Sequence, residues 1–147
     1  RHEIEVDLIA PYELARRAAR WWIANDHPGV VVNLGSVLGE GSGGKLRLPG
    51  YAAAKGGLHN LTRELATQWA RKGIRVNALA PAWFETEMNS DTMFHDDAGI
   101  AYVESGTPMG RGGMAHELDG ALLLLASDAG SYMTGHVLLV DGGWTSV

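Results

Sequence analysis

The chain alternates between segments whose apolar side chains recur every three to four positions and short runs that are apolar almost throughout. Apolar residues at that spacing share one face of a helix, and they predict helices over 3–25, 51–72 and 115–127. The short runs suit buried strands of a parallel sheet, and they cover 30–34, 74–80 and 136–140. The alternation of helix and strand is typical of an α/β protein with a parallel sheet.

Residues 81–111 follow neither pattern, although they leave room for a short helix. Loops of this length in a compact domain usually have a function, so we expect this segment to cover a substrate as a lid. Near the start of the chain, Pro11 interrupts the first helical segment. Because proline has no N–H, the carbonyl of Asp7, four residues earlier, is expected to lose its helical partner.

The composition narrows the possible functions. The 147 residues are enough for one domain, and 46% hydrophobic with 20% charged residues is ordinary for a globular protein. The net charge of -5 and the lack of a basic patch argue against a nucleic-acid partner. The absence of cysteine excludes disulfides, and the six histidines do not pair at metal-ligand spacing, so no metal is expected. A polar start and apolar runs far shorter than ~18 residues predict a cytoplasmic protein without a membrane span.

Two nucleotide-binding patterns overlap in the glycine-rich loop after the first predicted strand, and neither is complete. Residues 39–44 fit G-x-G-x-x-G, but that fingerprint requires a helix directly after the loop, and residues 45–49 intervene. Residues 39–45 also fit the beginning of a P-loop, whose next residue should be Ser or Thr to hold magnesium. That residue is Leu46, so we interpret the segment as a surface loop.

The strongest chemical signal is the pair Tyr51 and Lys55, which a helix would place on one face, one turn apart. An ammonium group beside a phenol favours the ionised phenol, which can act as an acid and a base. Ser36 follows the first predicted strand at its carboxyl end, where open α/β sheets place their ligands. A hydroxyl at that position can donate to a substrate oxygen that gains negative charge.

These features together resemble the short-chain dehydrogenase/reductase family over essentially all of the chain. The segments that carry the resemblance are Asn-Leu-Gly-Ser at 33–36, Tyr-Ala-Ala-Ala-Lys at 51–55, Ile-Arg-Val-Asn-Ala-Leu-Ala-Pro at 74–81, Thr-Glu-Met at 86–88, Leu-Ala-Ser-Asp at 125–128, Tyr-Met-Thr-Gly at 132–135 and Val-Asp-Gly-Gly at 140–143. The resemblance implies a Rossmann-like doubly wound sheet, of which these residues would form the C-terminal half.

The resemblance also implies residue roles. Tyr51 would donate the proton in reduction and accept it in oxidation, Lys55 would activate Tyr51, and Ser36 would hold the carbonyl or alcohol oxygen. Asn33 and Asn77 are expected to brace the strand ends rather than to touch substrate. The residues implied to bind NAD or NADP are Tyr51, Lys55, Pro81, Phe84 and Thr86. An apolar wall of the substrate site is expected from Trp83, Phe84, Met88, Met93 and Phe94.

Some positions depart from the family pattern. Asp7 stands where the family usually has an asparagine that holds a water for a proton relay through its main-chain carbonyl, and Pro11 would free that carbonyl here. Ala82 replaces a usual glycine, and Ser36 and Tyr51 are slightly further apart than is typical. The N-terminal half that binds the adenosine end of the cofactor is expected to be missing, so residues 1–147 form a partial domain that should bind no cofactor tightly by itself.

The sequence therefore predicts an NAD(P)-dependent oxidoreductase that acts on a secondary alcohol or ketone. The Val-Asp-Gly-Gly-Trp ending and the pair Trp83–Phe84 resemble members that act on sugars, sugar acids and polyols. A 3-oxoacyl thioester reductase and a non-catalytic subunit of the same family stay open as alternatives. The family also implies a homotetramer or dimer, because the helices that contain Trp21, Trp22 and Trp69 resemble those that pack between subunits.

Overall fold

The computed structural model describes residues 1–42, 46–86 and 94–147. The α-helices are α1 (His2–Ile4), α2 (Ala10–Ala24), α3 (Pro49–Trp69), α4 (Asp97–Gly106) and α5 (Asp119–Ala126). The strands are β1 (Gly29–Leu34), β2 (Ile74–Pro81) and β3 (Val137–Val140). A π-helical turn, η1 (Glu5–Ile9), joins α1 to α2, and short 3₁₀ turns are η2 (Val37–Gly39), η4 (Ala70–Lys72), η5 (Ala115–Leu118), η6 (Asp128–Gly130) and η7 (Trp144–Ser146). Of the residues discussed above, Gly43, Gly44, Lys45, Glu87, Met88 and Met93 lie outside the described part.

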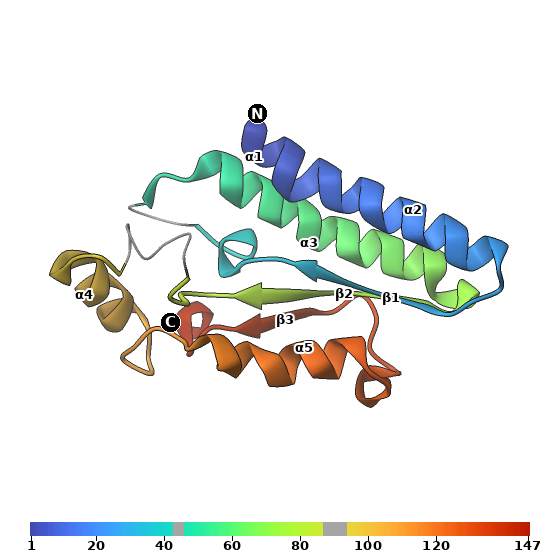
Figure 1. The fold of residues 1–147 in the computed structure, drawn as a ribbon. Coiled ribbons are helices and arrows are strands. Elements are labelled where there is room, and N and C mark those ends of the chain that lie inside the picture. The colour runs from blue at the N-terminus through green and yellow to red at the C-terminus, as the bar shows by residue number, and fades with distance from the viewer. Residues whose placement is uncertain (43–45, 87–93) are drawn as a thin grey trace.

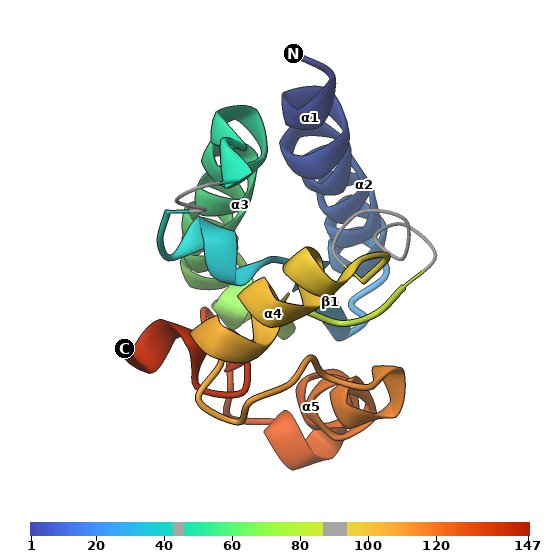
Figure 2. The same ribbon diagram turned by 90° about the vertical axis from the view of Figure 1, so that its left-hand side faces the viewer.

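The described strands form one parallel sheet in the order β1-β2-β3. Gly29 pairs with Ile74 at one end of the β1–β2 ladder, and Ala78 pairs with Val137 where β3 joins. Helices α2 and α3 lie side by side over one face of the sheet, and α5 covers the other face (Figure 1). The end-on view shows the three layers, with α4 at the carboxyl ends of the strands (Figure 2). The α/β class predicted from the alternating pattern is confirmed.

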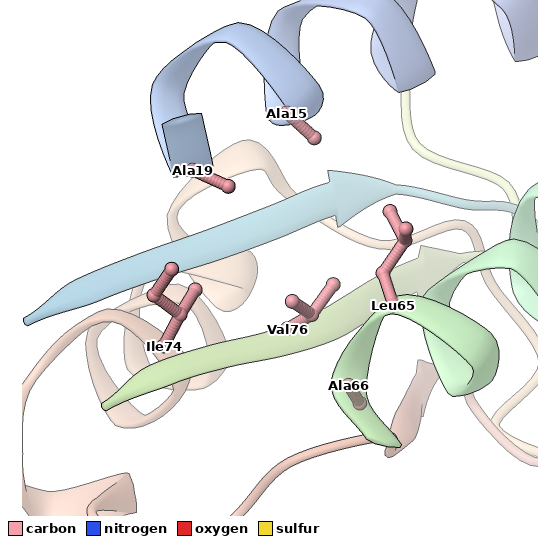
Figure 3. Packing of buried hydrophobic residues seen from close by; sticks show 6 residues of the cluster. All are labelled: Ala15, Ala19, Leu65, Ala66, Ile74 and Val76. Carbon is pink, nitrogen blue, oxygen red and sulfur yellow. The ribbon is translucent and has the colours of Figure 1, made fainter. Parts of the chain in front are cut away.

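The core lies between the α2–α3 layer and the sheet, and small residues set its thickness. Ala15 and Ala19 of α2 are buried against a cluster to which β2 contributes Ile74 and Val76, both fully buried (Figure 3). Alanines allow the helix backbone to approach the strands closely, and interiors are packed too densely to admit a larger side chain without a shift. Each fully buried Ile or Val contributes roughly 1.5–3 kcal/mol of transfer free energy, so this cluster anchors α2 to the sheet.

Strand β1 differs from its sequence prediction of a buried strand. Its valines at 30–32 are only half-buried, and Leu34 is 62% exposed. The cause is position in the sheet, because β1 is an edge strand in the described part of the chain whereas β2 lies between two neighbours. An apolar run shows that a segment suits a buried strand, but it does not show which strands lie at an edge.

The first helix continues through Pro11 without breaking, because the turn before the proline is wider than an α-turn. The Ala10 N–H donates to the Glu5 carbonyl, five residues earlier, which is the π-helical pattern. In a regular α-helix the proline ring would clash with the carbonyl four residues back, that of Asp7. The wide turn avoids that clash and places one extra residue between His2 and Ala24.

Polar side chains of β2 fasten the C-terminal part of the chain to the sheet. The Arg75 guanidinium donates to the carbonyls of Leu125, Ser127 and Met133 at distances of 2.9, 3.0 and 3.3 Å. Asn77 is fully buried, donates to the Met133 carbonyl at 2.8 Å and accepts the His136 N–H at 3.0 Å. Asn77 therefore braces its strand, as expected from the sequence.

The tryptophans of the helical layer have different environments. Trp21 is exposed, whereas Trp22 and Trp69 pack against the core cluster. The ring of Trp22 lies against Gly29, where a larger residue would collide with it.

An ion pair holds η5 near the C-terminal part of the chain. Arg111 donates two hydrogen bonds to Glu117 and, together with the Met114 N–H, lowers the pKa of the Glu117 carboxyl to about 2.

Candidate active site

The sequence-predicted catalytic residues lie at the carboxyl ends of the strands. Ser36 follows β1 directly, and Tyr51 and Lys55 lie in the first two turns of α3. Helix α3 begins at Pro49, whose fixed φ suits the first helical position. The Glu3 side chain lies against Gly50 in this first turn, where a carboxylate interacts favourably with the helix dipole. The beginning of α3, which carries Tyr51, is thus supported by the start of the chain.

The Lys55 ammonium is the centre of the described polar contacts. The residue is only 6% exposed, and a buried charge requires partners. Its Nζ donates to the Leu34 carbonyl at 2.8 Å and forms an ion pair with Asp7 Oδ1 at 3.1 Å. It lies 5.4 Å from the centre of the Tyr51 ring. The contacts fix the ammonium beside the phenol, between the carboxyl end of β1 and the first helix.

Ser36 is held at the N-terminus of η2. It is 7% exposed, and its Oγ accepts the Leu38 N–H at 3.2 Å. A hydroxyl has one donor proton and two acceptor lone pairs, so this contact leaves the proton available for a substrate oxygen. The backbone N–H of Ser36 points to His59 Nε2 at 3.4 Å. Asn33, just before Ser36, donates to Thr62 Oγ1 at 2.9 Å and links β1 to α3.

The opposite side of this region is formed by the segment that follows β2. Pro81 ends the strand, Phe84 is buried and forms a bridge with Gly113, and Thr86 is exposed. Trp83 packs edge-on against Tyr102 of α4 and Trp144, with ring centres 6.1 and 5.3 Å apart. The predicted lid therefore includes a regular helix, α4, which is tied to the C-terminus through aromatic rings.

A small cavity of about 90 Å³ is lined in part by Trp83, Thr107, Arg111 and Asp141. Two buried polar atoms, Trp83 Nε1 and Thr107 Oγ1, have no hydrogen-bond partner within residues 1–42, 46–86 and 94–147. Burial raises the pKa of Asp141, but hydrogen bonds from Thr145 and Gly143 outweigh it, so the pKa lies below its ordinary value.

The structure brings Asp7, Tyr51 and Lys55 together beside the β1 end that leads to Ser36, whereas Pro81, Phe84 and Thr86 lie on the other segment. Sequence reasoning assigned a role to the Asp7 carbonyl and did not foresee that its carboxylate contacts Lys55. It also missed His59, which is 1% exposed and contacts the Ser36 loop. The continued four-residue spacing of Tyr51, Lys55 and His59 was the available signal.

The glycine-rich loop has a more specific structure than a surface loop where it is described. Gly35 and Gly39 approach the His59 ring so closely that a side chain at either position would collide with it. Among the described residues, no group of three or more His, Cys, Asp or Glu side chains could hold a metal ion. In the same part of the chain, no helix is both long enough and apolar enough to cross a membrane.

Comparison with known proteins agrees with this geometry. The family model described as enoyl-(acyl carrier protein) reductase matches residues 1–145. The chain belongs to the short-chain dehydrogenase/reductase family. Galactitol 2-dehydrogenase (L-tagatose-forming) of Cereibacter sphaeroides is 45% identical to this family member over 117 residues, which are 80% of this chain and 46% of that protein. The 2-dehydro-3-deoxy-D-gluconate 5-dehydrogenase of Escherichia coli K12 is 33% identical over 96% of this chain and 54% of its own length.

Solved structures of the family have the same fold. A gluconate 5-dehydrogenase from Burkholderia cenocepacia J2315, in complex with NADP and tartrate, is 38% identical and superposes with a TM-score of 0.91, covering 98% of this chain and 55% of that one. A 4-hydroxyisoleucine dehydrogenase complexed with NADH is 30% identical with a TM-score of 0.88, covering 98% of this chain and 58% of that one. The chain spans about half the length of the relatives it matches.

Proposed function

We propose that this chain is the catalytic half of an NAD(P)-dependent dehydrogenase that oxidises a secondary alcohol of a sugar acid or polyol and runs the reverse reduction. The observation that carries the proposal is the position of the Lys55 ammonium. It is buried, held by the Leu34 carbonyl and the Asp7 carboxylate, and lies 5.4 Å from the Tyr51 ring at the carboxyl end of β1. The contact places a positive charge next to the ring whose oxygen must exchange the alcohol proton.

Ser36 and Tyr51 have separate roles in the proposed reaction. Ser36 donates a hydrogen bond through its hydroxyl to the substrate oxygen and so orients the alcohol or carbonyl group. In oxidation, the Tyr51 oxygen accepts the proton of the alcohol while the C–H bond of the same carbon breaks, and in reduction it returns the proton. A bound nicotinamide would accept the hydrogen of this C–H bond as hydride in oxidation and would supply a hydride in reduction.

The donor set fits a nicotinamide cofactor. An ammonium has three N–H donors. Among the described residues, the Lys55 ammonium directs two of them toward the Leu34 carbonyl and the Asp7 carboxylate. The third is available to a ribose hydroxyl, as the family resemblance implies. Pro81, Phe84 and Thr86 would contact the cofactor from the segment after β2. The presence of NADP or NADH in the related structures supports the cofactor class.

The substrate class rests on the relatives. One of the relatives described above is named for 4-hydroxyisoleucine. The other three act, by name, on galactitol, gluconate and 2-dehydro-3-deoxy-D-gluconate, and a gluconate 5-dehydrogenase of Gluconobacter oxydans is 42% identical over 80% of this chain. Such substrates share a polyhydroxylated carbon chain with a secondary alcohol. Trp83, Tyr102 and Trp144 form a cluster of aromatic rings after β2, and aromatic side chains of this kind suit contact with the C–H edges of such a chain.

One alternative has specific support. The family model is described as enoyl-(acyl carrier protein) reductase, and a probable 2,4-dienoyl-CoA reductase of Bacillus subtilis is 35% identical over 95% of this chain. These names share an acyl thioester with the alternative substrate, although an enoyl or dienoyl reductase reduces a C=C bond and a 3-oxoacyl reductase reduces a ketone. A 3-oxoacyl thioester reductase would use Ser36, Tyr51 and Lys55 in the same roles. A non-catalytic subunit is the third candidate, and the presence of Ser36, Tyr51 and Lys55 together at the carboxyl end of β1 disfavours it.

A substrate panel tests the proposal. The full-length protein is assayed at 340 nm with NAD⁺ and NADP⁺ against gluconate, galactitol and related sugar acids, and with NADPH against a 3-oxoacyl thioester. Oxidation of a sugar acid or polyol with kcat/KM far above the thioester value is expected. Turnover of the thioester alone would replace the proposal by its alternative. Cofactor binding without turnover of any substrate would favour the non-catalytic subunit.

The remaining parts of the proposal concern the whole protein. We propose that residues 1–147 belong to a Rossmann-like domain whose other half binds the adenosine end of the cofactor, since the relatives are about twice as long. A homotetramer or dimer is the proposed assembly, supported by exposed apolar side chains of α2 such as Leu14 and Trp21. Light scattering measures the assembly, and cell fractionation tests the proposed cytoplasmic location.

A further inference from the structure

His59 connects helix α3 to the loop that carries Ser36. It lies two turns after Tyr51 and one turn after Lys55 on the same helix, and it is 1% exposed. A polar side chain buried this deeply is costly unless its polar atoms are paired. Both ring nitrogens of His59 have partners, and both partners belong to the segment between Ser36 and Glu40.

The two contacts fix the protonation of the ring. Nε2 lies 3.4 Å from the Ser36 backbone nitrogen, which has only a proton to offer, so Nε2 must be the acceptor. Nδ1 lies 2.8 Å from Glu40 Oε1, an acceptor, so Nδ1 carries the proton. The imidazole is therefore neutral, and it bridges the two ends of η2. Arg63 donates to the same Glu40 oxygen at 3.2 Å and holds the carboxylate in place.

The backbone of the loop is shaped around this ring. A Cβ at Gly35 would meet Nε2, and a Cβ at Gly39 would meet Cε1 at 2.6 Å and the Lys55 backbone at 2.8 Å. Only glycine permits such a close approach. Ser36 lies between these two glycines, and its own hydroxyl accepts the Leu38 N–H. The loop backbone that carries the Ser36 hydroxyl is thus shaped by contacts that converge on His59.

We propose that His59 is a positioning residue for the dehydrogenase reaction: its neutral imidazole holds the Ser36 loop so that the serine hydroxyl meets the substrate oxygen, and protonation of the imidazole releases the loop. The proposal rests on the proposed function for the role of Ser36. His59 itself contacts neither Tyr51 nor a reacting atom in this arrangement. It acts only through the Ser36 N–H and Glu40.

Acid is the natural way to disturb this contact. Burial lowers the pKa of His59 below its ordinary value of 6.5; Glu40 opposes this effect, while the cations Arg63 and Lys55 add to it. When Nε2 is protonated, its N–H faces the Ser36 N–H, and two donors cannot bond. Because the folded-state pKa is lowered, the neutral ring is favoured by the fold, and this stability is present above about pH 6.5 and is lost as the pH falls through the folded-state pKa.

Two substitutions separate positioning from folding. His59→Gln places an amide where its oxygen can accept the Ser36 N–H and cannot titrate, whereas His59→Leu removes the acceptor. With the full-length protein and the best substrate of the panel, kcat of His59→Leu is expected to fall about tenfold, because a displaced Ser36 hydroxyl would lose the equivalent of one hydrogen bond to the substrate oxygen. The KM for the cofactor should stay unchanged, and His59→Gln should stay near the wild-type rate.

The pH profile gives the sharper test. The rate is measured in the direction of reduction, where Tyr51 must carry its proton and contributes no acid limb. There the wild-type kcat should fall as the pH decreases through the titration of His59, and His59→Gln should lose that acid limb. His116→Gln is the matched control, because His116 is exposed and lies in η5 on the other side of the sheet; it should keep the wild-type profile. An unchanged rate in His59→Leu, or an acid limb retained in His59→Gln, would overturn the proposal.

A spectroscopic measurement separates failure of this proposal from failure of the proposed function. In a ¹⁵N-labelled sample, the Ser36 amide resonance should shift with the same midpoint as the His59 imidazole, whether or not any substrate is turned over. The shift should be absent in His59→Gln and present in His116→Gln. If the Ser36 amide does not respond to His59 titration, the positioning role is wrong even where the dehydrogenase activity is found.

Discussion

On the α3 side of the candidate site, buried polar side chains are paired with other atoms of the chain, whereas on the α4 side two buried polar atoms are not. The paired set on the α3 side is Asn33, Ser36, Lys55, His59 and Thr62. On the α4 side, Trp83 Nε1 and Thr107 Oγ1 have no partner among the described residues. Aromatic ring contacts hold that side together instead.

The difference indicates that the α3 side and the α4 side have different roles in the proposed reaction. Hydrogen bonds are directional, so a paired polar network fixes the positions of its atoms before a substrate arrives. Ring contacts tolerate small displacements and define a shape rather than a direction. We therefore expect the α3 side to determine the rate of the chemical step and the α4 side to determine which substrate fits. The following substitutions test that contrast.

Tyr51→Phe should have the largest effect. It removes only the phenol oxygen, and general acid–base groups typically contribute about 10²–10⁴-fold, so kcat should fall by that factor while the KM for substrate changes little. Steady-state rates measure this, and a thermal melt equal to that of the wild type would show that the fold is intact. A variant that retained a tenth or more of the wild-type kcat would remove the α3 side from the chemical step.

Thr62→Val tests whether pairing on the α3 side also stabilises the fold. Thr62 is fully buried, accepts from Asn33 and donates to the Leu58 carbonyl. Valine has the same shape, so no cavity forms, but the Asn33 amide loses its acceptor at a cost of about 1–3 kcal/mol in the free energy of unfolding. Urea unfolding measures it. Thr67→Val on the same helix, where the hydroxyl is exposed and bonds to the Glu64 carbonyl, should change stability by less than about 0.5 kcal/mol.

Trp83→Leu, on the α4 side, should affect the KM for substrate more than kcat. It removes ring contacts with Tyr102 and Trp144, each worth about 0.5–1.5 kcal/mol. The expected result is a rise of up to about tenfold in the KM for substrate with a smaller change in kcat. Trp83→Phe keeps a ring, so its KM for substrate should lie between the KM values of the wild type and of Trp83→Leu. If Trp83→Leu lowered kcat at unchanged KM, the assignment of fit to this side would be wrong.

Asp7→Asn should have the smallest effect. The amide oxygen can still accept from Lys55, and partly exposed ion pairs contribute about 0–1 kcal/mol. Asp7 is partly exposed, at 24% of its side chain. The rate should change by less than about threefold, and the melting temperature of the wild type, unlike that of the variant, should decrease slightly between about 0.05 and 0.5 M salt. Glu5→Gln, which removes an exposed carboxylate on the same helix, is the control. A large loss of rate would show that the carboxylate itself is required.

The sequence was informative where a single element carries the pattern. The spacing of Tyr51 and Lys55 placed both on one helix face, and the apolar runs located the three strands of the described residues. It was less informative where a contact joins distant segments, since nothing local indicates that His59 meets the Ser36 loop, 23 positions earlier. Helix α4 was predicted only as a possibility inside a loop, because Gly99 and Gly106 weaken its pattern, although Asp96 caps it by accepting the Gly99 N–H.

The wide turn at Glu5–Ile9 changes the phase of the first helix. Glu3 and Ala15 are twelve positions apart, which would leave them about 120° apart around a regular α-helix, at about 100° per residue. The extra residue in the π-turn reduces that difference to about 20°. Glu3 can therefore face Gly50 at the beginning of α3 while Ala15 faces the core. A one-residue deletion within this turn would leave Glu3 and Ala15 eleven positions apart on a regular helix, still about 20° from each other, so the phase would be kept while the Pro11 ring would meet the carbonyl four residues back.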